Sequence, residues 1–241
     1  MKKIKYIFII LITCIGFISC SDVNSVHDKY LVDGEDLLVG KLDTIRYYGG
    51  DQRARIVVWA GDFRATKFII SRADTTLSYN FKLSDTNRKD SMVFFVNNLR
   101  EGTNVLQFVT WNADSTVHSI GTTKTIITWG NKYRSLLTNR TVVSSKFNLL
   151  TKAYTLTWAP NNVVEPTYGK PAIGHEIKYM NTDGEEKMIR DIYTNPIMPT
   201  ATTPLVKYPT VNGSYSYRMI YLPDVSCIDT FRTAYTTVVT P

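Results

Sequence analysis

The sequence is poor in the residues that build metal sites and disulfide frameworks. Its 241 residues include three Cys and three His. This scarcity excludes a disulfide-stapled miniprotein and a Cys/His-dense zinc array. The chain also lacks a long block of consecutive Lys or Arg, although its formal net charge is +7. We therefore do not expect nucleic acid as a partner.

The residues that are abundant favour strands. The chain has 30 Thr and 15 Tyr against 10 Ala, and Thr and Tyr suit a pleated, half-buried surface whereas Ala favours helices. With 44% hydrophobic and 20% charged residues, there is enough apolar surface for sizeable cores, which excludes wholesale disorder. We expect an all-β globular protein of one or two domains.

The first residues have the pattern of a secretion signal. Lys2, Lys3 and Lys5 precede a nearly continuous apolar run over residues 6–18, which ends in Ser19-Cys20. The run is too short for a membrane-spanning helix, which needs about 20 apolar residues. It therefore predicts a signal peptide over residues 1–19 rather than a transmembrane anchor.

The end of this signal resembles a bacterial lipobox, Phe17-Ile18-Ser19-Cys20, in which the Cys is acylated and becomes the first mature residue. The alternative is an ordinary signal peptide with Cys20 near its cleavage site. We expect lipidation of Cys20 and membrane attachment through it. Each buried methylene of an acyl chain contributes about 0.8 kcal/mol, so two or more acyl chains anchor a protein stably where one does not. Ser21 follows the Cys, not the Asp of inner-membrane retention. That resemblance implies the outer membrane, at the cell surface or, alternatively, on its periplasmic side.

Removal of the signal peptide changes the number of free cysteines. Cys14 leaves with the signal and Cys20 carries lipid, so Cys227 alone remains and no intrachain disulfide forms. Three of the positive charges also belong to the signal. The residual charge is small.

The mature chain reads as two series of short strands bounded by turn residues. Their spacing, roughly eight to twelve residues, favours β-sandwiches. The first series comprises Leu42–Tyr48, Arg53–Ala60, Thr66–Arg72, Leu77–Leu83, Ser91–Asn97, Thr103–Asn112 and Thr122–Trp129; the second comprises Val142–Leu149, Tyr154–Ala159, Ile173–Asn181, Glu185–Tyr193, Leu205–Tyr208, Ser214–Leu222 and Ile228–Val239. We expect a tether at 20–29, a sandwich at 30–135, a linker at 136–141 and a second sandwich at 142–241.

The two series resemble copies of one unit. Trp59-Ala60 closes the second strand of one series and Trp158-Ala159 that of the other, which suggests duplication. The alternative is that any two sandwiches share buried Trp residues and Gly turns. We assign both Trp59 and Trp158 to cores. Trp129 and Tyr133, near the linker, are expected to hold the two domains together.

Two long irregular segments interrupt the second series. Pro-rich Thr194–Pro209 is expected to form a loop or edge segment. Asn161–Ala172, with Tyr168-Gly169 between two prolines, is the other. Because long loops on sandwiches often carry binding residues, Tyr168 is a candidate ligand contact.

A family resemblance rests on motifs that follow one another in order between residues 25 and 141. They are Tyr30-Leu31-Val32-Asp33-Gly34-Glu35, Gly40-Lys41-Leu42-Asp43, Gly50 with Arg53, Asn98-Leu99-Arg100-Glu101-Gly102-Thr103, and Gly130-Asn131-Lys132-Tyr133 with Asn139-Arg140. This segment resembles a family of Bacteroides-type lipoproteins, domain of unknown function 4998. The resemblance implies two tandem fibronectin-III-like or immunoglobulin-like sandwiches behind a lipoprotein signal, and it implies no catalytic residues. The sequence departs from the family pattern at Trp111-Asn112-Ala113-Asp114-Ser115.

The candidate catalytic motifs fail on spacing. His175-Glu176 lacks the second His four residues on that a zinc protease needs, since that position is Tyr179. Glu185 and Glu186 are neighbours on a predicted strand and point to opposite faces, so they are expected to be solvated rather than paired across a cleft. We expect no catalytic residue, no metal site and no cofactor.

Binding is the function that remains. Leu106, Phe108 and Thr110 are expected to face inward, which turns Trp111 outward with Gln107. Trp111, Gln107 and Tyr168 are therefore candidate ligand contacts; the alternative for Trp111 is a partly covered sandwich or interdomain residue.

We expect a lipid-anchored, non-catalytic binding or adhesion module with a glycan or surface-protein ligand. A carbohydrate-active enzyme, or an accessory subunit of a surface glycan-utilisation complex, is one alternative. A purely structural spacer is another.

Overall fold

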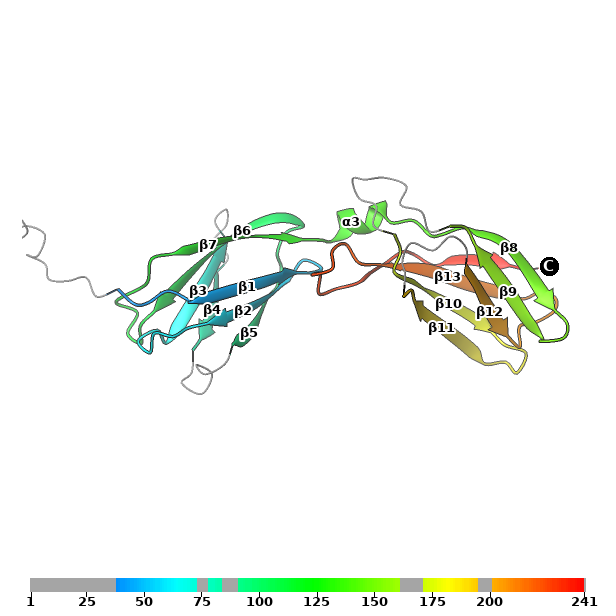
Figure 1. The fold of residues 1–241 in the computed structure, drawn as a ribbon, viewed down its shortest axis with the longest axis horizontal. Helices are drawn as coiled ribbons and strands as arrows, with labels where there is room; N and C mark the ends of the chain where they lie inside the picture. The colour runs from blue at the N-terminus through cyan, green and yellow to red at the C-terminus, as the bar shows by residue number, and fades with distance from the viewer. Residues whose placement is uncertain (1–37, 73–77, 84–90, 161–170, 195–200, 241) are drawn as a thin grey trace, which may run out of the picture.

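The computed structural model describes residues 38–72, 78–83, 91–160, 171–194 and 201–240. Within these ranges the chain forms two β-sandwiches arranged end to end, as Figure 1 shows. The predicted all-β, two-sandwich architecture is confirmed. Cys20 and Tyr168 lie outside the described residues.

The first sandwich packs a three-stranded sheet against a four-stranded one. Its sheets have the strand orders β1-β2-β5 and β4-β3-β6-β7, with every pair antiparallel. The strands are β1 (Thr44–Gly49), β2 (Ala54–Trp59), β3 (Lys67–Arg72), β4 (Ser78–Lys82), β5 (Met92–Val96), β6 (Gly102–Trp111) and β7 (Thr122–Thr128). Alternate side chains from both sheets fill the core, among them Ile56, Phe68 and Phe108.

The second sandwich repeats this arrangement. Its sheets have the orders β12-β9-β8 and β11-β10-β13, with β13 also pairing to β14 and β15. The strands are β8 (Val142–Asn148), β9 (Ala153–Trp158), β10 (Gly174–Met180), β11 (Glu186–Ile192), β12 (Ala201–Val206), β13 (Ser214–Tyr221), β14 (Phe231–Arg232) and β15 (Thr236–Val239). In both sandwiches the smaller sheet contains the first, second and fifth strands, which is the relationship that a duplication would produce. Trp158 and Leu156 lie in the second core.

The predicted strands of the second sandwich are found in the structure, except that two of them have different bounds. The fifth strand is Ala201–Val206 instead of Leu205–Tyr208. Pro204 fits there because β12 lies at the edge of its sheet, where one side needs no ladder donor. The predicted last strand, Ile228–Val239, is divided into β14 and β15. The turn at Asp183-Gly184 is confirmed, with Gly184 at φ +78.

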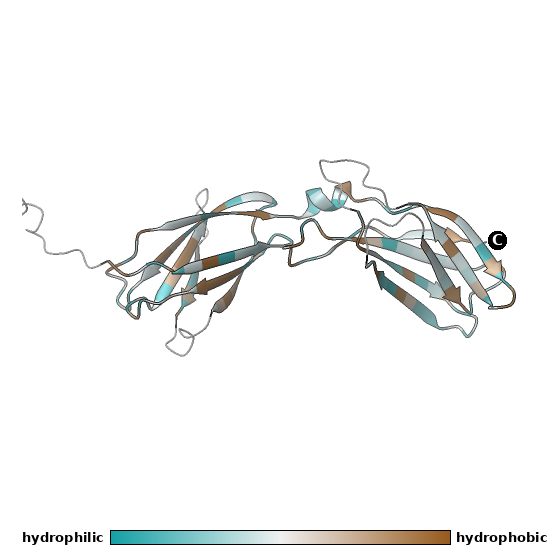
Figure 2. Cartoon of the chain, viewed as in Figure 1, coloured by the Kyte–Doolittle hydropathy of each residue, from teal (hydrophilic) through white to brown (hydrophobic). Residues whose placement is uncertain are grey.

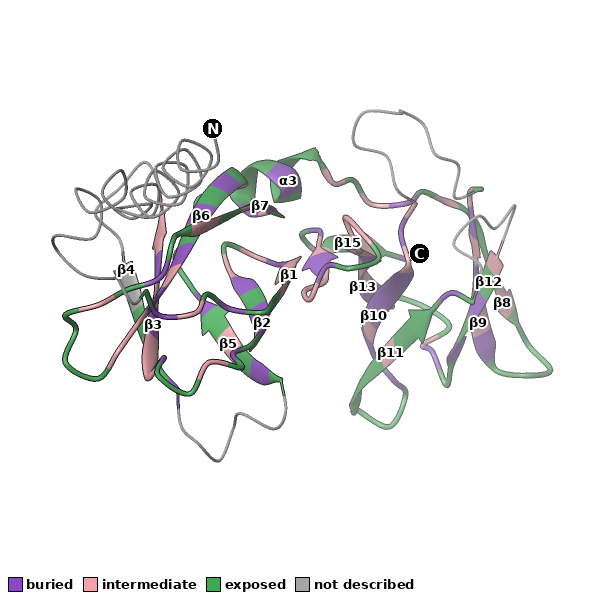
Figure 3. Cartoon of the chain, turned by 60° about the vertical axis from the view of Figure 1, so that its left-hand side comes forward, coloured by how far each residue is buried: buried purple, intermediate pink, exposed green. Residues whose placement is uncertain are grey.

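The assignment of Trp59 to the core is wrong. Along β2, Ala54, Ile56 and Val58 are buried, whereas Trp59 is 47% exposed. Figure 3 shows this alternation of buried and exposed residues along β2. Trp158 ends β9 on the buried side instead, with 0% exposure. The two tryptophans therefore differ by one step of the strand alternation, and one step reverses the face.

A short helix and a long loop join the sandwiches. Helix α3 (Asn131–Leu136) follows β7, and Glu101 of the first sandwich accepts hydrogen bonds from the backbone N–H groups of Lys132 (2.7 Å) and Tyr133 (2.6 Å). The Tyr133 ring packs edge-on against Phe231, with centroids 5.0 Å apart. Trp129 also packs against this cluster. The prediction that Trp129 and Tyr133 hold the domains together is confirmed.

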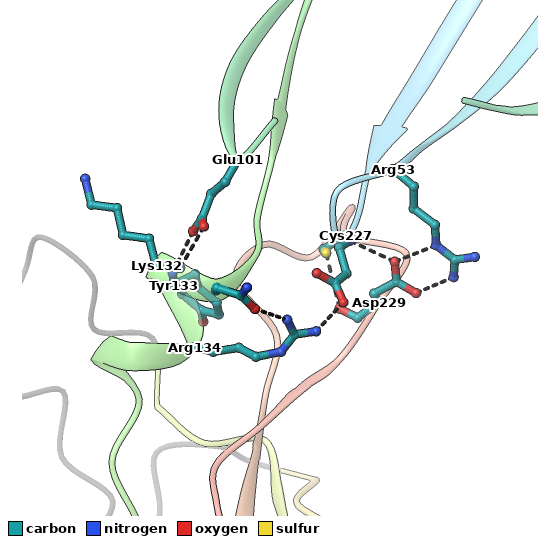
Figure 4. A network of polar contacts seen from close by, with 9 residues as sticks. Arg53, Glu101, Lys132, Tyr133, Arg134, Cys227 and Asp229 are labelled. Carbon is teal, nitrogen blue, oxygen red and sulfur yellow. Dashed lines mark hydrogen bonds and ion pairs between the residues drawn. The ribbon is translucent and has the colours of Figure 1, made fainter. Parts of the chain in front are cut away.

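The loop between β13 and β14 adds a second set of ties. Asp229 accepts hydrogen bonds from the Asp51 backbone N–H (2.9 Å) and the Arg53 side chain, and the Ile228 N–H donates to the Gly49 carbonyl (3.0 Å). Figure 4 shows how Asp229 and Arg53 face each other here. A Cβ on Gly50 would lie 2.3 Å from the Asp229 carboxylate, so this close approach requires glycine. No helix in the described part of the chain is long and apolar enough to cross a membrane.

Candidate functional site

The outer surface of the β1-β2-β5 sheet carries a cluster of exposed aromatic, aliphatic and arginine side chains. The strand register places Tyr48, Arg55 and Phe95 in one row and Arg46, Val57 and Val93 in the next, with Trp59 beyond them. We call these seven residues the aromatic face.

The sequence of β5 explains why this surface is apolar. The strand reads MVFFV, so hydrophobic side chains point to both sides of the sheet. Figure 2 shows β5 as hydrophobic along its length. Met92 and Val96 are buried, whereas Val93 and Phe95 are 45% and 49% exposed. Together with Trp59 they form an apolar surface on which burial against a partner would contribute about 25 cal/mol per Å².

The charge of the aromatic face has one sign. Strands β1, β2 and β5 contain no Asp or Glu. The Arg55 guanidinium lies 5.6 Å from the centroid of the Tyr48 ring, and Arg53 at the adjoining edge lies 5.7 Å from that of Phe95. These cation–π contacts hold the guanidinium groups against the rings. The face is therefore suited to a ligand that offers apolar and acidic groups together.

Trp111 points outward from β6 but is partly covered. Leu106, Phe108 and Thr110 face inward as expected, and Trp111 lies on the outer side of β6. Its ring packs against His118, with centroids 4.7 Å apart, and it is half-buried. Its indole Nε1 is buried and has no hydrogen-bond partner. Of the two interpretations, the structure favours the partly covered sandwich residue.

Of the other predicted contacts, Gln107 lies within the described residues. Gln107 is exposed on the same side of β6, and its side chain lies over Gly121, where a Cβ would be 2.5 Å from its amide nitrogen. Tyr168 and Cys20 fall outside the described residues.

His175 is a core residue of the second sandwich. Its ring nitrogens are hydrogen-bonded to the Tyr193 hydroxyl (2.9 Å) and to Thr203 Oγ1 (3.2 Å). Thr203 Oγ1 also accepts a hydrogen bond from Trp158 Nε1 at 3.0 Å. Burial lowers the pKa of His175 to about 4, so the ring is neutral at pH 7. Within the described ranges, no group of three His, Cys, Asp or Glu side chains could hold a metal ion.

Glu185 and Glu186 are solvated, as predicted. Their side chains are 60% and 63% exposed, and each lies near a lysine, Lys187 at 2.6 Å and Lys178 at 3.8 Å. The Lys187 hydrogen bond holds the pKa of Glu185 below its ordinary value. Neither carboxylate is part of a buried site.

The aromatic face was missed although the sequence held a signal for it. Period-2 alternation from Ile56 and Val58 already turns Trp59 outward. The apolar pattern of Met92–Val96 adds two outward hydrophobic positions beside it. Trp59 was assigned to the core because immunoglobulin-like sandwiches commonly contain a buried tryptophan.

Comparisons with known proteins identify the family of this chain. No curated protein matches the chain. Among solved structures, the FN1–FN3 domains of chicken CNTN1 are similar over 84% of this chain and 65% of that one, at 10% identity and a TM-score of 0.41. This chain thus spans somewhat under two thirds of that structure.

The family match extends beyond the segment that carried the resemblance in the sequence. It covers residues 20–231 and so includes the first sandwich and the second as far as the start of β14. The chain belongs to the family described as domain of unknown function 4998.

Proposed function

We propose that this protein is a lipid-anchored, outer-membrane or cell-surface binding module that acts without catalysis and engages its ligand through the aromatic face. One observation carries the proposal: Trp59, Val93 and Phe95 are each close to half exposed on one side of a sheet that has arginines and no carboxylate. Such a patch has an energetic cost in water that a ligand would remove.

The composition of the face favours a protein ligand. Trp, Tyr and Arg are the residue types that dominate binding energy at protein interfaces, and here they surround a central aliphatic pair, Val57 and Val93. The face extends over three neighbouring strands, which suits a broad contact. Excess positive charge selects a partner with acidic groups at its rim.

The direction of the chain supports display from a membrane. Leu38, the first described residue, enters the first sandwich at the end of the molecule away from the second sandwich (Figure 1). Cys20 precedes it in the sequence. A lipid on Cys20 would therefore place the aromatic face in the membrane-proximal sandwich, where another envelope protein is within reach.

The test compares Trp59→Ala with Ile127→Ala, a matched control in which an exposed apolar side chain is removed from the opposite sheet; Ile127 is 56% exposed on β7. The full-length variants are photo-cross-linked in the cells that make them, and the bound proteins are identified and quantified. We expect one protein partner to be lost with Trp59→Ala and retained with Ile127→Ala. Equal recovery of every partner from both variants would show that the aromatic face is not the binding surface.

A parallel measurement separates protein from glycan ligands. Each variant is applied to immobilised envelope glycans. Glycan binding that depends on Trp59, without a Trp59-dependent protein partner, would replace the protein ligand by a glycan.

A further inference from the structure

A buried carboxylate on the second sandwich lies among three arginines. In β10, Glu176 is directly opposite Arg190 of β11 on one side and Arg218 of β13 on the other, and Arg232 of β14 lies one strand further. Because His175 points into the core, Glu176 points to the outer surface of the sheet. We call Glu176, Arg190, Arg218 and Arg232 the arginine cluster.

Glu176 fixes two of these guanidinium groups. Its Oε2 accepts a hydrogen bond from Arg218 Nε at 2.6 Å, and its Oε1 accepts one from Arg232 Nε at 3.2 Å. Arg190 Nε lies 3.8 Å from Oε1. Burial alone would raise the pKa of Glu176, but the hydrogen bonds from Arg218 and Arg232 hold it below its ordinary value. The carboxylate is therefore charged at neutral pH and orients the arginines around it.

The cluster has more positive charge than Glu176 can compensate. Three guanidinium groups share one carboxylate, so two positive charges have no counter-charge among the described members of the cluster. The Glu176 side chain is 4% exposed, whereas Arg218, Arg232 and Arg190 are 28%, 33% and 51% exposed. The carboxylate is thus inaccessible to solvent while the surplus N–H donors remain at the surface.

Tyr235 secures one side of the cluster. The Arg218 guanidinium lies 4.4 Å from its ring centroid and the Lys178 ammonium lies 5.3 Å from it. Lys178 follows Glu176 on the same face of β10 and adds another cation, 3.8 Å from the exposed Glu186. The cations therefore occupy adjacent strands of one sheet, which lie about 4.8 Å apart.

We propose that the arginine cluster binds the carboxylate groups of an acidic polysaccharide. Guanidinium groups pair with carboxylates through two parallel N–H donors, and Arg218 and Arg232 are already oriented by Glu176, so little side-chain freedom is lost on binding. A row of cations across neighbouring strands matches a polymer that carries charge at each repeat.

The neighbouring side chains favour a sugar over a peptide. Beside Lys178, the next positions across the sheet are Ser216 and Thr237, whose hydroxyl groups lie 2.8 Å apart. Hydroxyl groups hydrogen-bond to sugar hydroxyls. The centre of a protein interface instead buries an aromatic or aliphatic anchor. This site is separate from the aromatic face and does not rest on it.

The test measures binding of the full-length protein, purified in detergent, to immobilised polygalacturonate over a range of salt concentrations. We expect retention at low salt that weakens as salt rises, and no retention on uncharged dextran. Arg190→Gln and Arg232→Gln should each weaken binding about tenfold, because each removes charge-assisted hydrogen bonds. Lys146→Gln is the matched control, since it removes one exposed positive charge from β8 in the other sheet.

Three results would overturn the proposal. The first is binding by Arg190→Gln and Arg232→Gln that is as tight as that of Lys146→Gln, with all three unfolding at the wild-type temperature. The second is retention on dextran equal to retention on polygalacturonate. Finally, polyglutamate retained equally, with the same loss in Arg190→Gln, would assign the cluster to acidic polypeptides. Trp59→Ala should retain full polygalacturonate binding, which separates this result from the outcome at the aromatic face.

Discussion

Arg53 of the first sandwich donates two hydrogen bonds to Asp229 of the second, from Nε to Oδ2 at 2.8 Å and from Nη2 to Oδ1 at 2.5 Å. The bidentate geometry fixes both groups, since each guanidinium N–H meets its own oxygen. The two residues are 176 positions apart in the chain. They connect the sandwiches beside the covalent linker, since Asp51, whose backbone N–H also binds Asp229, pairs with Arg134 of α3.

Asp229→Asn should loosen the junction. Arg53 is 43% exposed, so solvent screens the pair and the loss of stability should be about 1 kcal/mol or less. The larger effect should be a broader distribution of interdomain distances in small-angle X-ray scattering. Asp62→Asn is the control, because Asp62 pairs with Arg64 within the first sandwich; equal broadening in both variants would contradict a role for Asp229.

The Asp229 interaction should also depend on pH. The hydrogen bond from Arg53 holds the pKa of Asp229 below its ordinary value of 3.8. A lowered folded-state pKa means that the stabilisation is present above about pH 4 and is lost as the pH falls through the folded-state pKa. Scattering profiles recorded from pH 7 down through the folded-state pKa of Asp229 should broaden for the wild type at the acidic end, and Asp229→Asn should already be broad at pH 7.

Cys227 should report on the same junction. Burial raises the pKa of its thiol to about 11, so almost no thiolate exists at pH 7 and alkylation should be slow. Gly50→Ala should accelerate it, because the new methyl group would lie 2.6 Å from Ile228 and displace the β13–β14 loop. Peptide mapping by mass spectrometry measures the modified fraction at Cys227. An unchanged rate in Gly50→Ala would show that the loop is not held by this contact.

The second sandwich should lose stability between about pH 6.5 and pH 4. Burial lowers the pKa of His175 from 6.5 to about 4 in the folded state, so the unfolded chain binds the extra proton first as the pH falls. The loss should be of the order of 3 kcal/mol. Urea unfolding at a series of pH values measures it. His175→Gln should flatten this pH dependence, whereas His118→Gln in the first sandwich should leave it intact.

The two strand-end tryptophans should differ sharply. Trp158→Ala should cost about 3 to 5 kcal/mol, because it empties a fully buried site and leaves Thr203 without its indole donor. Trp59→Ala should cost less than about 1 kcal/mol, since its ring is half in solvent. Chemical denaturation measures both. Comparable losses would contradict the outward placement of Trp59.

Lipidation is tested directly at the terminus. Radiolabelled palmitate should enter the wild-type protein and fail to enter Cys20→Ala, because the acyl chains require that thiol. Cys227→Ala, which removes the buried thiol, should label like the wild type. Label in Cys20→Ala would contradict lipidation of Cys20.

Strand identity could be predicted from the sequence because side-chain alternation and turn residues act locally. The positions of β2, β6 and the Asp183-Gly184 turn followed from such patterns. The bounds of the fifth strand could not be predicted: Ala201–Val206 forms an edge strand that includes Pro204, whereas the strand was expected at Leu205–Tyr208.

The candidate site was harder to predict than the fold. Trp111 was expected to point outward, with partial cover as an alternative, and the His118 ring that covers it is brought there by a bridge that the sequence does not show. The arginine cluster depends on the register of three strand pairs around Glu176, and register is set by the whole sheet. Neither relationship could be read from spacing along the chain.

The ties from Asp229 to Arg53 and from Glu101 to the start of α3 have a mechanical consequence. They lie in parallel with the peptide chain that connects β7 to β8, so a pull applied along the molecule is shared between covalent and non-covalent connections. Bending between the sandwiches works against the Arg53–Asp229 pair and the Tyr133–Phe231 ring contact, while the Glu101 hydrogen bonds hold α3 to the first sandwich. A force along the molecule is therefore carried jointly by the covalent linker, the Arg53–Asp229 pair and the Tyr133–Phe231 contact.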